Sequence, residues 1–271
     1  MTKNRPGEPA KVLTIAGSDS GGAAGLQADL KTFSTLGVYG MSVITAVTAQ
    51  NSLRVDGVWP VPAEFVVRQL DSVLSDYGAK AIKTGFIGSA EVIQAIGQSL
   101  AAYRSETANR IYLVIDPVLV NHLGESMFPA DMTDAFTKYL FPLADLVTPN
   151  LAESQLLAGI NASSLVTTER AARIIQAQGP QMVLVKGIRS GSDMVDLLFD
   201  GKKARLVRHP FIESSNTHGS GDTLSAAICA YLANGTPMTT AIERSCEFTY
   251  AAIRRAVNWQ LGRGHGPLSY W

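Results

Sequence analysis

The segment at residues 214–235, SSNTHGSGDTLSAAICAYLANG, places two glycines and an acid directly before an apolar run. A helix that begins here has unpaired backbone N–H groups and a partial positive charge of about +0.5, which together bind anions. Gly219 and Gly221 let the backbone approach such an anion, and Asp222 would stand beside it as a base. Phosphoryl transfer suits this arrangement, because it depends on alignment and charge neutralisation. The alternative is that Asp222 or Ser220 only caps the helix.

Three further polar residues follow apolar runs that are typical of buried strands. They are Asp116 in VIDPV, Asn150 in DLVTPN and Lys186 in VLVKG. Ligands of open α/β sheets bind beyond the carboxyl ends of the strands, so we expect these residues to converge. Asp116 would bind a ligand or metal ion, or hydrogen-bond its own loop. Lys186 would place a positive charge on a phosphate, or be an ordinary solvated strand end.

Asn150 and Glu153 stand three residues apart in TPNLAE, at the start of a predicted helix. An amide and a carboxylate on neighbouring positions of one face can hold Mg²⁺ through water. The same spacing is that of a capping box, in which each side chain binds the other residue's backbone N–H. Both interpretations stay open at this point.

A glycine-rich loop, AGSDSGGAAGLQADLK, lies between the first predicted strand and the first predicted helix. A small ligand can approach the backbone there, and Asp29 would hydrogen-bond a polar heterocycle. Gln50, at the end of VITAVTAQ, presents both a donor and an acceptor. A plain tight turn and plain surface residues are the alternatives. The sequence has no Walker A motif, and its four histidines lack the spacing of a zinc site.

Short apolar runs rich in β-branched residues alternate with amphipathic stretches, which predicts a mostly parallel sheet joined by helices. Predicted strands cover residues 11–17, 40–50, 79–85, 110–118, 144–150 and 181–187. Predicted helices cover residues 25–37, 62–78, 89–103, 219–234 and 238–256, with Ser89 as a cap. Residues 194–210 predict an antiparallel hairpin that turns at Asp200-Gly201.

The chain has 271 residues, 46% of them hydrophobic, and a formal net charge of +0. We expect one domain over residues 1–271 with a disordered tail at 1–9. Without a basic excess we expect no nucleic-acid partner. No apolar run reaches the ~20 residues that span a bilayer, and the N-terminus lacks a signal-peptide pattern, so we expect no membrane contact and a cytoplasmic location. Cys229 and Cys246 fit a reducing compartment.

Nearly the whole chain resembles the hydroxymethylpyrimidine and phosphomethylpyrimidine kinases of thiamine biosynthesis, in the ribokinase-like superfamily. The motifs that carry the resemblance are LTIAGSDSGGAAGLQADLKTFSTLGVYGMSVITAVTAQN, IDPV, TPNLAE, VLVKG, NTHGSGDTLSAAI and GRGHGP. The resemblance implies a three-layer αβα fold with a mostly parallel central sheet, ATP and Mg²⁺, and a homodimer. It also implies that 4-amino-5-hydroxymethyl-2-methylpyrimidine is phosphorylated, and then its monophosphate.

The resemblance also assigns roles to individual residues. Asp222 would activate the acceptor hydroxyl. The residues implied in pyrimidine binding are Gly17, Ala24, Asp29 and Gln50, with Phe86 where the family often has methionine. The implied anion hole consists of Gly219, Ser220 and Gly221. The residues implied at Mg²⁺ and the phosphates are Asp116 and Glu153, and those implied at the ATP phosphates are Asn150 and Lys186.

Asp222 departs from the family pattern, because many members have cysteine at this position and aspartate is usual in pyridoxal kinases. A carboxylate there would repel a monophosphate acceptor unless Mg²⁺ or Lys186 intervenes. A pyridoxal kinase of the same fold is therefore an alternative. A pyrimidine-binding sensor without turnover is another, which the acids beside the bound nucleotide disfavour.

Overall fold

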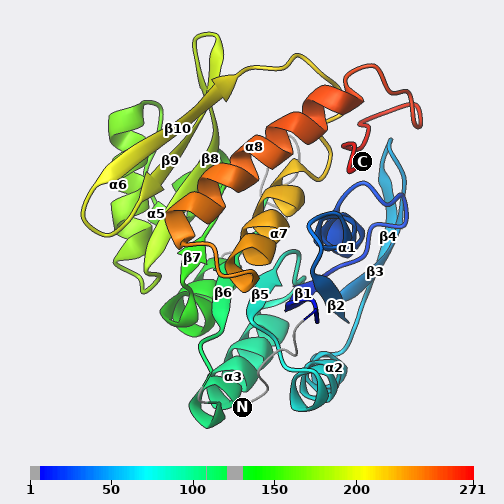
Figure 1. Ribbon diagram of the computed structural model, residues 1–271. Coiled ribbons are helices and arrows are strands. Elements are labelled where there is room, and N and C mark those ends of the chain that lie inside the picture. The colour runs from blue at the N-terminus through cyan, green and yellow to red at the C-terminus, as the bar shows by residue number, and fades with distance from the viewer. Residues whose placement is uncertain (1–6, 108, 121–130) are drawn as a thin grey trace.

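Within the described residues, the central sheet of the computed structural model has eight strands in the order β10-β9-β8-β7-β6-β5-β1-β2 (Figure 1). The structure describes residues 7–107, 109–120 and 131–271, so most of the predicted tail at 1–9 lies outside it. The strands of this sheet are β1 (Lys11–Ala16), β2 (Tyr39–Ile44), β5 (Ala81–Thr84), β6 (Tyr112–Ile115), β7 (Leu146–Val147), β8 (Met182–Ser190), β9 (Asp193–Phe199) and β10 (Ala204–Pro210).

Six neighbouring strands of the sheet, from β2 through β1, β5, β6 and β7 to β8, pair in parallel. Strands β9 and β10 add an antiparallel edge to β8. The predicted hairpin and its turn are confirmed, since the Asp200 backbone N–H donates to the Lys203 carbonyl oxygen. The parallel strands place their carboxyl ends at one edge, where a ligand site is expected.

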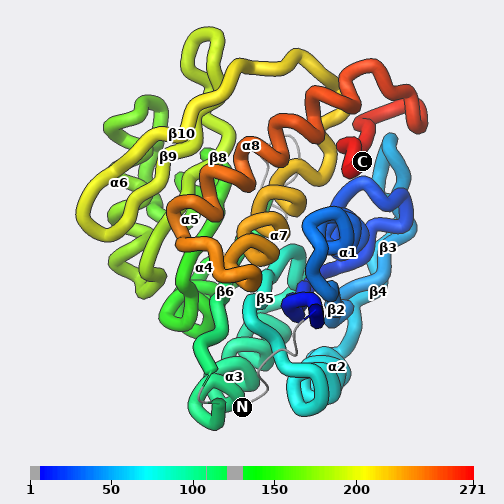
Figure 2. The backbone as a smooth tube through the Cα atoms, in the orientation of Figure 1, coloured from blue at the N-terminus to red at the C-terminus, as the bar shows by residue number. Residues whose placement is uncertain are grey.

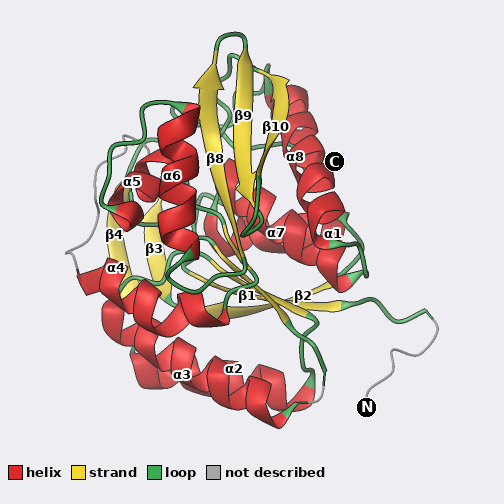
Figure 3. Ribbon diagram, turned by 90° about the vertical axis from the view of Figure 1, so that its left-hand side faces the viewer, coloured by secondary structure: helices red, strands yellow, loops and turns green. Residues whose placement is uncertain are grey.

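Helices cover both faces of the sheet, which confirms the three-layer fold (Figure 3). Val12 and Leu13 show how one strand serves both layers, because alternate side chains of a strand point to opposite faces. Val12 belongs to the core cluster on the face covered by α1 (Gly25–Thr35), α7 (Ser220–Ala233) and α8 (Met238–Ala256). Leu13 belongs to the cluster on the face covered by α2 (Ala63–Asp76), α3 (Ala90–Glu106) and α6 (Leu165–Gln176). The predicted helices are confirmed, and the Ser89 hydroxyl accepts from Val92 N–H as the predicted cap.

The helices of the described chain divide between the two layers. On one face lie α1 (Gly25–Thr35), α7 (Ser220–Ala233) and α8 (Met238–Ala256). On the other lie α2 (Ala63–Asp76), α3 (Ala90–Glu106), α4 (Asp131–Ala135), a π-helical turn (Phe136–Leu140), a 3₁₀ turn (Phe141–Leu143), α5 (Leu151–Ala158) and α6 (Leu165–Gln176). Helices α4 and α6 were not predicted from the sequence.

The predicted strand at residues 40–50 is wrong in one respect, because it is two strands in different sheets. β2 stays in the central sheet, whereas β3 (Ala46–Gln50) pairs antiparallel with β4 (Val55–Pro60) in a separate hairpin. Thr45 stabilises the break: its N–H donates to Ala16, its hydroxyl donates to Phe86, and its carbonyl accepts from Val61. These three contacts satisfy the polar groups where the chain leaves the sheet.

The C-terminal segment returns to the N-terminal half of the fold, beside α1 and the β3–β4 hairpin (Figure 2). The backbone N–H of His265 donates to the Ser52 carbonyl oxygen at 2.8 Å, and Ser52 lies in the turn of that hairpin. None of the helices in the described part of the chain combines the length and hydrophobicity that a bilayer crossing requires.

Candidate active site

The turn before α7 has the backbone conformation that the glycine pattern predicts. Gly219 is the N-cap of α7 with φ +82° and ψ 10°, and no side chain caps the helix. A Cβ atom on Gly219 would overlap the carbonyl oxygen of Ala23, so only glycine fits. Asp222 is therefore not the cap, and the first-turn amides of Gly221 and Asp222 have no acceptor within the helix. The turn has the geometry of an anion site.

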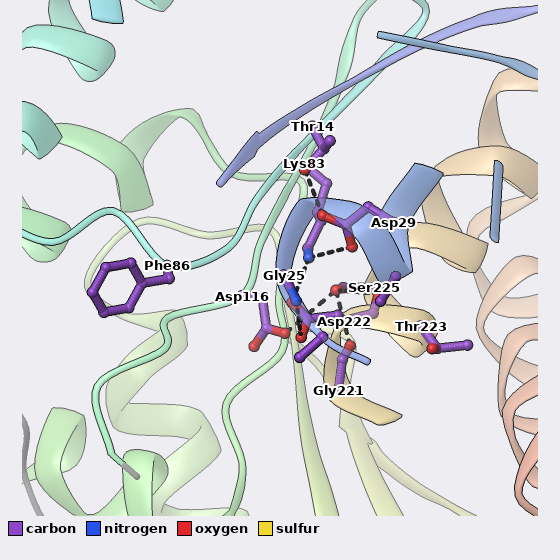
Figure 4. Close-up of polar contacts among 12 residues, drawn as sticks. Thr14, Gly25, Asp29, Lys83, Phe86, Asp116, Gly221, Asp222, Thr223 and Ser225 are labelled. Atoms are coloured by element: carbon purple, nitrogen blue, oxygen red, sulfur yellow. Dashed lines mark hydrogen bonds and ion pairs between the residues drawn. The ribbon is translucent and has the colours of Figure 1, made fainter. Parts of the chain in front are cut away.

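Both carboxylate oxygens of Asp222 are held in place (Figure 4). Oδ1 accepts from the Lys83 ammonium at 2.9 Å, and Oδ2 accepts from the Gly25 backbone N–H at 3.1 Å. Burial acts to raise the pKa of Asp222, but the charge and hydrogen bond of Lys83, the Gly25 N–H and the charge of Lys186 together outweigh it and leave the pKa below its usual value. The side chain is 16% exposed. Asp222 thus presents an ionised, oriented carboxylate at the surface of the turn.

Lys83, in β5, is a site residue that the sequence analysis missed. Its ammonium lies 2.6 Å from Asp29 Oδ1, and neither side chain has any exposed surface. Thr14 donates to the other Asp29 oxygen at 2.6 Å. Burial raises the pKa of Asp29 to about 7 against the opposing effect of Lys83. The signal available in the sequence was a lysine inside the apolar strand AIKT, where a charge needs a buried partner.

A second buried ion pair lies on the other side of the α7 N-terminus. The Lys186 ammonium contacts Asp116 Oδ1 at 2.6 Å, and the Ser225 hydroxyl donates to Asp116 Oδ2 at 3.3 Å. A Cβ atom on Gly221 would lie only 3.0 Å from Lys186 Nζ, so the ammonium sits against the turn. Burial acts to lower the pKa of Lys186, but the carboxylates of Asp116, Glu153 and Asp222 together outweigh it and the pKa is raised. The predicted convergence of Asp116 and Lys186 is confirmed.

Asn150 and Glu153 form the capping box that the sequence analysis left open. Asn150 Oδ1 accepts from Glu153 N–H at 2.9 Å, and Glu153 Oε2 accepts from Asn150 N–H at 2.8 Å. Glu153 Oε1 accepts from Leu119 N–H at 3.2 Å. Asn150 and Lys186 also form a β-bridge, so the box lies beside the second ion pair. Both oxygens of Glu153 are occupied, and burial raises its pKa to about 7.

Four of the residues predicted to bind pyrimidine lie around the glycine-rich loop. Gly17 N–H donates to the Phe86 carbonyl oxygen at 2.9 Å, and a Cβ atom on Gly17 would meet the Phe86 ring at 2.9 Å. Ala24 directly precedes α1 and packs against the Gly219 turn. The Gln50 amide nitrogen lies 3.3 Å from His218 Nε2, which ties β3 to the same turn.

Asp29 is placed differently from the expectation, because the structure encloses it. Its carboxylate has no exposed surface and contacts Thr14 and Lys83 rather than an open pocket. Asp29 therefore reaches Asp222 through Lys83, and a contact of its own with a heterocycle stays a prediction. The helix pattern explains the burial, since Asp29 lies on the face of α1 that also buries Leu26 and Phe33.

Asp19 is a second residue that the sequence analysis missed. Its carboxylate accepts three backbone N–H groups of the glycine-rich loop at 2.8–2.9 Å, those of Gly21, Ala23 and Ala24. Its side chain is almost fully buried, and His218 Nε2 lies 3.7 Å away. The SDSGG pattern, an acid before small residues, is the local signal for such a turn. Asp19 gives the loop its shape beside the Gly219 turn.

Comparisons with known proteins agree with one another. The phosphomethylpyrimidine kinase family model matches residues 19–269. The hydroxymethylpyrimidine/phosphomethylpyrimidine kinase of Rhizobium meliloti is 46% identical over 263 residues, 96% of each chain. The thiamine biosynthesis bifunctional protein ThiED of Geobacter sulfurreducens is 46% identical over 272 residues, and this chain spans 54% of its length. A pyridoxal kinase from Staphylococcus aureus, solved with AMP-PCP and pyridoxal, superposes with a TM-score of 0.86 at 37% identity, covering 97% of this chain and 94% of its own.

Proposed function

The chain belongs to the phosphomethylpyrimidine kinase family, and from this membership we propose the reaction that its site performs. The protein is a phosphotransferase of thiamine biosynthesis. Its first acceptor is 4-amino-5-hydroxymethyl-2-methylpyrimidine, and its second acceptor is the monophosphate of that compound. ATP is the donor, as the nucleotide analogue bound by the similar pyridoxal kinase supports. The observation that carries the proposal is the oriented, ionised Asp222 carboxylate in the first turn of α7.

In the first reaction Asp222 accepts the proton of the substrate hydroxymethyl group. The hydroxyl oxygen forms a bond to the γ-phosphorus of ATP, the bond from that phosphorus to the β–γ bridging oxygen breaks, and ADP leaves with the electron pair. The first-turn amides of α7 stabilise the negative charge that spreads over the transferring group. Pyrimidine binding is proposed for Gly17, Ala24, Gln50 and Phe86, and for Asp29 if it becomes accessible.

On the donor side, Lys186 and Asn150 would contact the ATP phosphates, where Lys186 supplies a point charge. No three His, Cys, Asp or Glu side chains among the described residues gather into a metal site of their own. Mg²⁺ is usually held by one or two carboxylates together with substrate phosphates and water. Asp116 would supply the carboxylate and Glu153, whose oxygens already accept N–H groups, would act through water. Bound Mg²⁺ would neutralise charge on the phosphates.

The second reaction brings a phosphate monoester beside Asp222, and like charges at that distance repel. Two ammonium groups flank the carboxylate, since Lys83 contacts it and Lys186 lies across the turn. Lys83 is also paired with Asp29 and Lys186 with Asp116, so the two ammonium groups reduce the repulsion rather than cancel it, and we infer that the second phosphorylation also occurs here. The acceptor is then a phosphate oxygen, which carries no proton that must be removed at neutral pH.

A coupled ADP-release assay tests the function with three acceptors: the pyrimidine alcohol, its monophosphate and pyridoxal. We expect turnover with the first two. The similarity to a pyridoxal kinase supports pyridoxal as a second candidate acceptor. Turnover with pyridoxal alone would replace the proposal with that activity. Binding of the pyrimidine without ADP release would favour the sensor.

We infer that residues 1–271 act as one kinase domain, since the described residues form one eight-stranded sheet, its covering helices and a small hairpin whose turn is hydrogen-bonded to the C-terminal segment. The cytoplasm is the proposed location, which the buried, unpaired Cys229 and Cys246 support. These inferences do not depend on the choice of acceptor.

A homodimer is proposed through the β3–β4 hairpin. The hairpin stands outside the central sheet, and every residue of β4 is exposed. Val47, Val58 and Trp59 leave apolar surface uncovered, with Trp59 75% exposed. A second copy of this hairpin would bury that surface.

Trp59→Glu should convert the dimer into a monomer, because a charge would be buried at the interface. Size-exclusion chromatography with light scattering measures the mass. Val166→Glu is the matched control, since Val166 is 78% exposed but lies on α6, which packs on β8 and β9. A Trp59 variant that keeps the dimeric mass would place the interface elsewhere.

A further inference from the structure

Lys83 presents a problem that the fold alone does not explain. Its ammonium group ends in the core with no exposed surface, and removing an ammonium from water is costly unless it is paired and hydrogen-bonded. Asp29, also without exposed surface, contacts it at 2.6 Å and in its ionised form balances the charge of Lys83. Asp29 alone therefore supplies the carboxylate partner that the buried ammonium group needs.

Asp222 brings a second carboxylate to the same ammonium, at 2.9 Å. With both carboxylates ionised, Lys83, Asp29 and Asp222 together carry a net charge of −1. A net charge that is largely buried is unfavourable. The raised pKa of Asp29, about 7, has burial as its largest cause, and the neighbouring Asp222 charge adds to it. Placing Asp222 beside the Lys83–Asp29 pair therefore costs stability, and such a cost at a reacting carboxylate indicates that the arrangement serves function.

Only one of the three side chains reaches the surface. Asp222 is 16% exposed, whereas Lys83 and Asp29 are fully enclosed. The ammonium binds Oδ1, and the Gly25 N–H at the start of α1 binds Oδ2, so neither oxygen is free to rotate away (Figure 4). Lys83 thereby joins β5 to the first turns of α1 and α7 beneath the anion site.

Resting on the proposed kinase function, we propose that Lys83 is a positioning residue for phosphoryl transfer, which holds the Asp222 carboxylate ionised and aimed at the acceptor while Asp29 anchors the ammonium. Lys83 itself touches neither substrate. When Asp222 receives the hydroxyl proton, the carboxyl becomes neutral and the Lys83–Asp29 pair is left balanced. The proton then passes from Asp222 to solvent as the phosphorylated product leaves.

Other charged or titratable groups act on this assembly from neighbouring elements. They include Lys186 of β8, Asp116 after β6, Cys229 of α7 and Tyr270 near the C-terminus. The effect of Lys186 on Asp222 has the same sign as that of Lys83, but it is smaller. Removing Lys83 therefore leaves the carboxylate with a weaker positive environment and one oxygen unbound.

Lys83→Met tests the proposal, with Lys80→Met as the matched control at an exposed position three residues earlier. We expect kcat to fall about tenfold to a hundredfold in the Lys83 variant with the KM for ATP nearly unchanged. Because Lys83 lowers the pKa of Asp222, its loss should move the acidic limb of the pH–rate profile upward by about one pH unit or more. Lys80→Met should behave as wild type.

A second variant separates positioning from folding. Lys83→Met alone leaves Asp29 buried without its cation and will destabilise the protein, whereas Asp29→Asn/Lys83→Met removes both buried charges. The double variant should regain much of the thermal stability and still show the lowered kcat and the shifted acidic limb. A double variant with wild-type kcat and an unshifted limb would show that Lys83 serves only the fold.

The carboxyl titration can also be followed without any substrate. The ¹³C resonance of the Asp222 carboxyl group, assigned by its loss in Asp222→Asn, should titrate at higher pH in the double variant than in wild type. This readout makes the two proposals separable. An upward shift in a protein that phosphorylates none of the acceptors would uphold the control of the Asp222 carboxyl group by Lys83 and overturn the kinase function. An unshifted titration in an active enzyme would overturn the role of Lys83 and leave the kinase function standing.

Discussion

Asp222→Asn is expected to lower kcat for the pyrimidine alcohol by about 10²- to 10⁴-fold, the range typical for removal of a positioned general base. The amide keeps the shape of the carboxylate and can still accept one hydrogen bond, but it carries no charge and cannot take the hydroxyl proton. The KM for ATP should change little, because Lys186 and the first-turn amides remain. Initial rates of ADP release over a range of ATP concentrations measure both quantities.

Asp76→Asn is the matched control for this experiment, since Asp76 is an exposed acid at the end of α2. It should keep wild-type rates. The same pair of variants distinguishes a sensor from an enzyme, because a sensor has no turnover for the asparagine to remove. If Asp222→Asn retained most of the wild-type kcat, the acceptor proton would have to leave by a route that avoids this carboxylate.

Gly219→Ala is expected to lower kcat/KM by roughly a hundredfold or more, similar to the loss of an oxyanion-hole donor. The left-handed φ of +82° costs a non-glycine residue about 1–2 kcal/mol. In addition, the new methyl group would overlap the Ala23 carbonyl oxygen, so the turn must shift and the first-turn amides must move with it. Steady-state kinetics and urea unfolding measure the two effects separately.

Gly235→Ala supplies the control at the other end of the same helix. Gly235 has φ +85° but no atom within 4 Å of an added Cβ. It should lose a similar amount of stability from backbone strain and none of the activity. Equal kcat/KM values for the two variants would show that the exact position of the Gly219 turn does not matter for phosphoryl transfer.

The site has two lysines, and each is paired with a different carboxylate. Lys83 pairs with Asp29 next to the Asp222 carboxylate, whereas Lys186 pairs with Asp116 on the proposed nucleotide side. Asp29 and Glu153 each have a pKa raised to about 7 by burial, so each lysine has one carboxyl neighbour that changes charge near neutral pH. The net charge around the α7 turn therefore depends on pH in the range where the enzyme is expected to work.

Local pattern in the sequence predicted most of the elements and part of the site. Residue periodicity and turn chemistry act over a few residues, so the strand before Asp116, the helix after Gly219 and the hairpin at Asp200-Gly201 were predictable. Parallel strands end at one edge, which was enough to predict that Asp116 and Lys186 converge. The glycines of HGSGD likewise indicated an anion site before any contact was known.

Tertiary structure alone decided which side chains pair across the core. Lys83 and Asp222 are 139 residues apart in the chain, and no local pattern encodes their contact. The burial of Asp29 and the exit of β3 from the sheet at Thr45 also depend on elements that arrive from elsewhere. Once the helices and strands have packed, each buried charge needs a partner, and that partner can come from a distant part of the chain. Neighbouring residues in the sequence do not show which partner it will be.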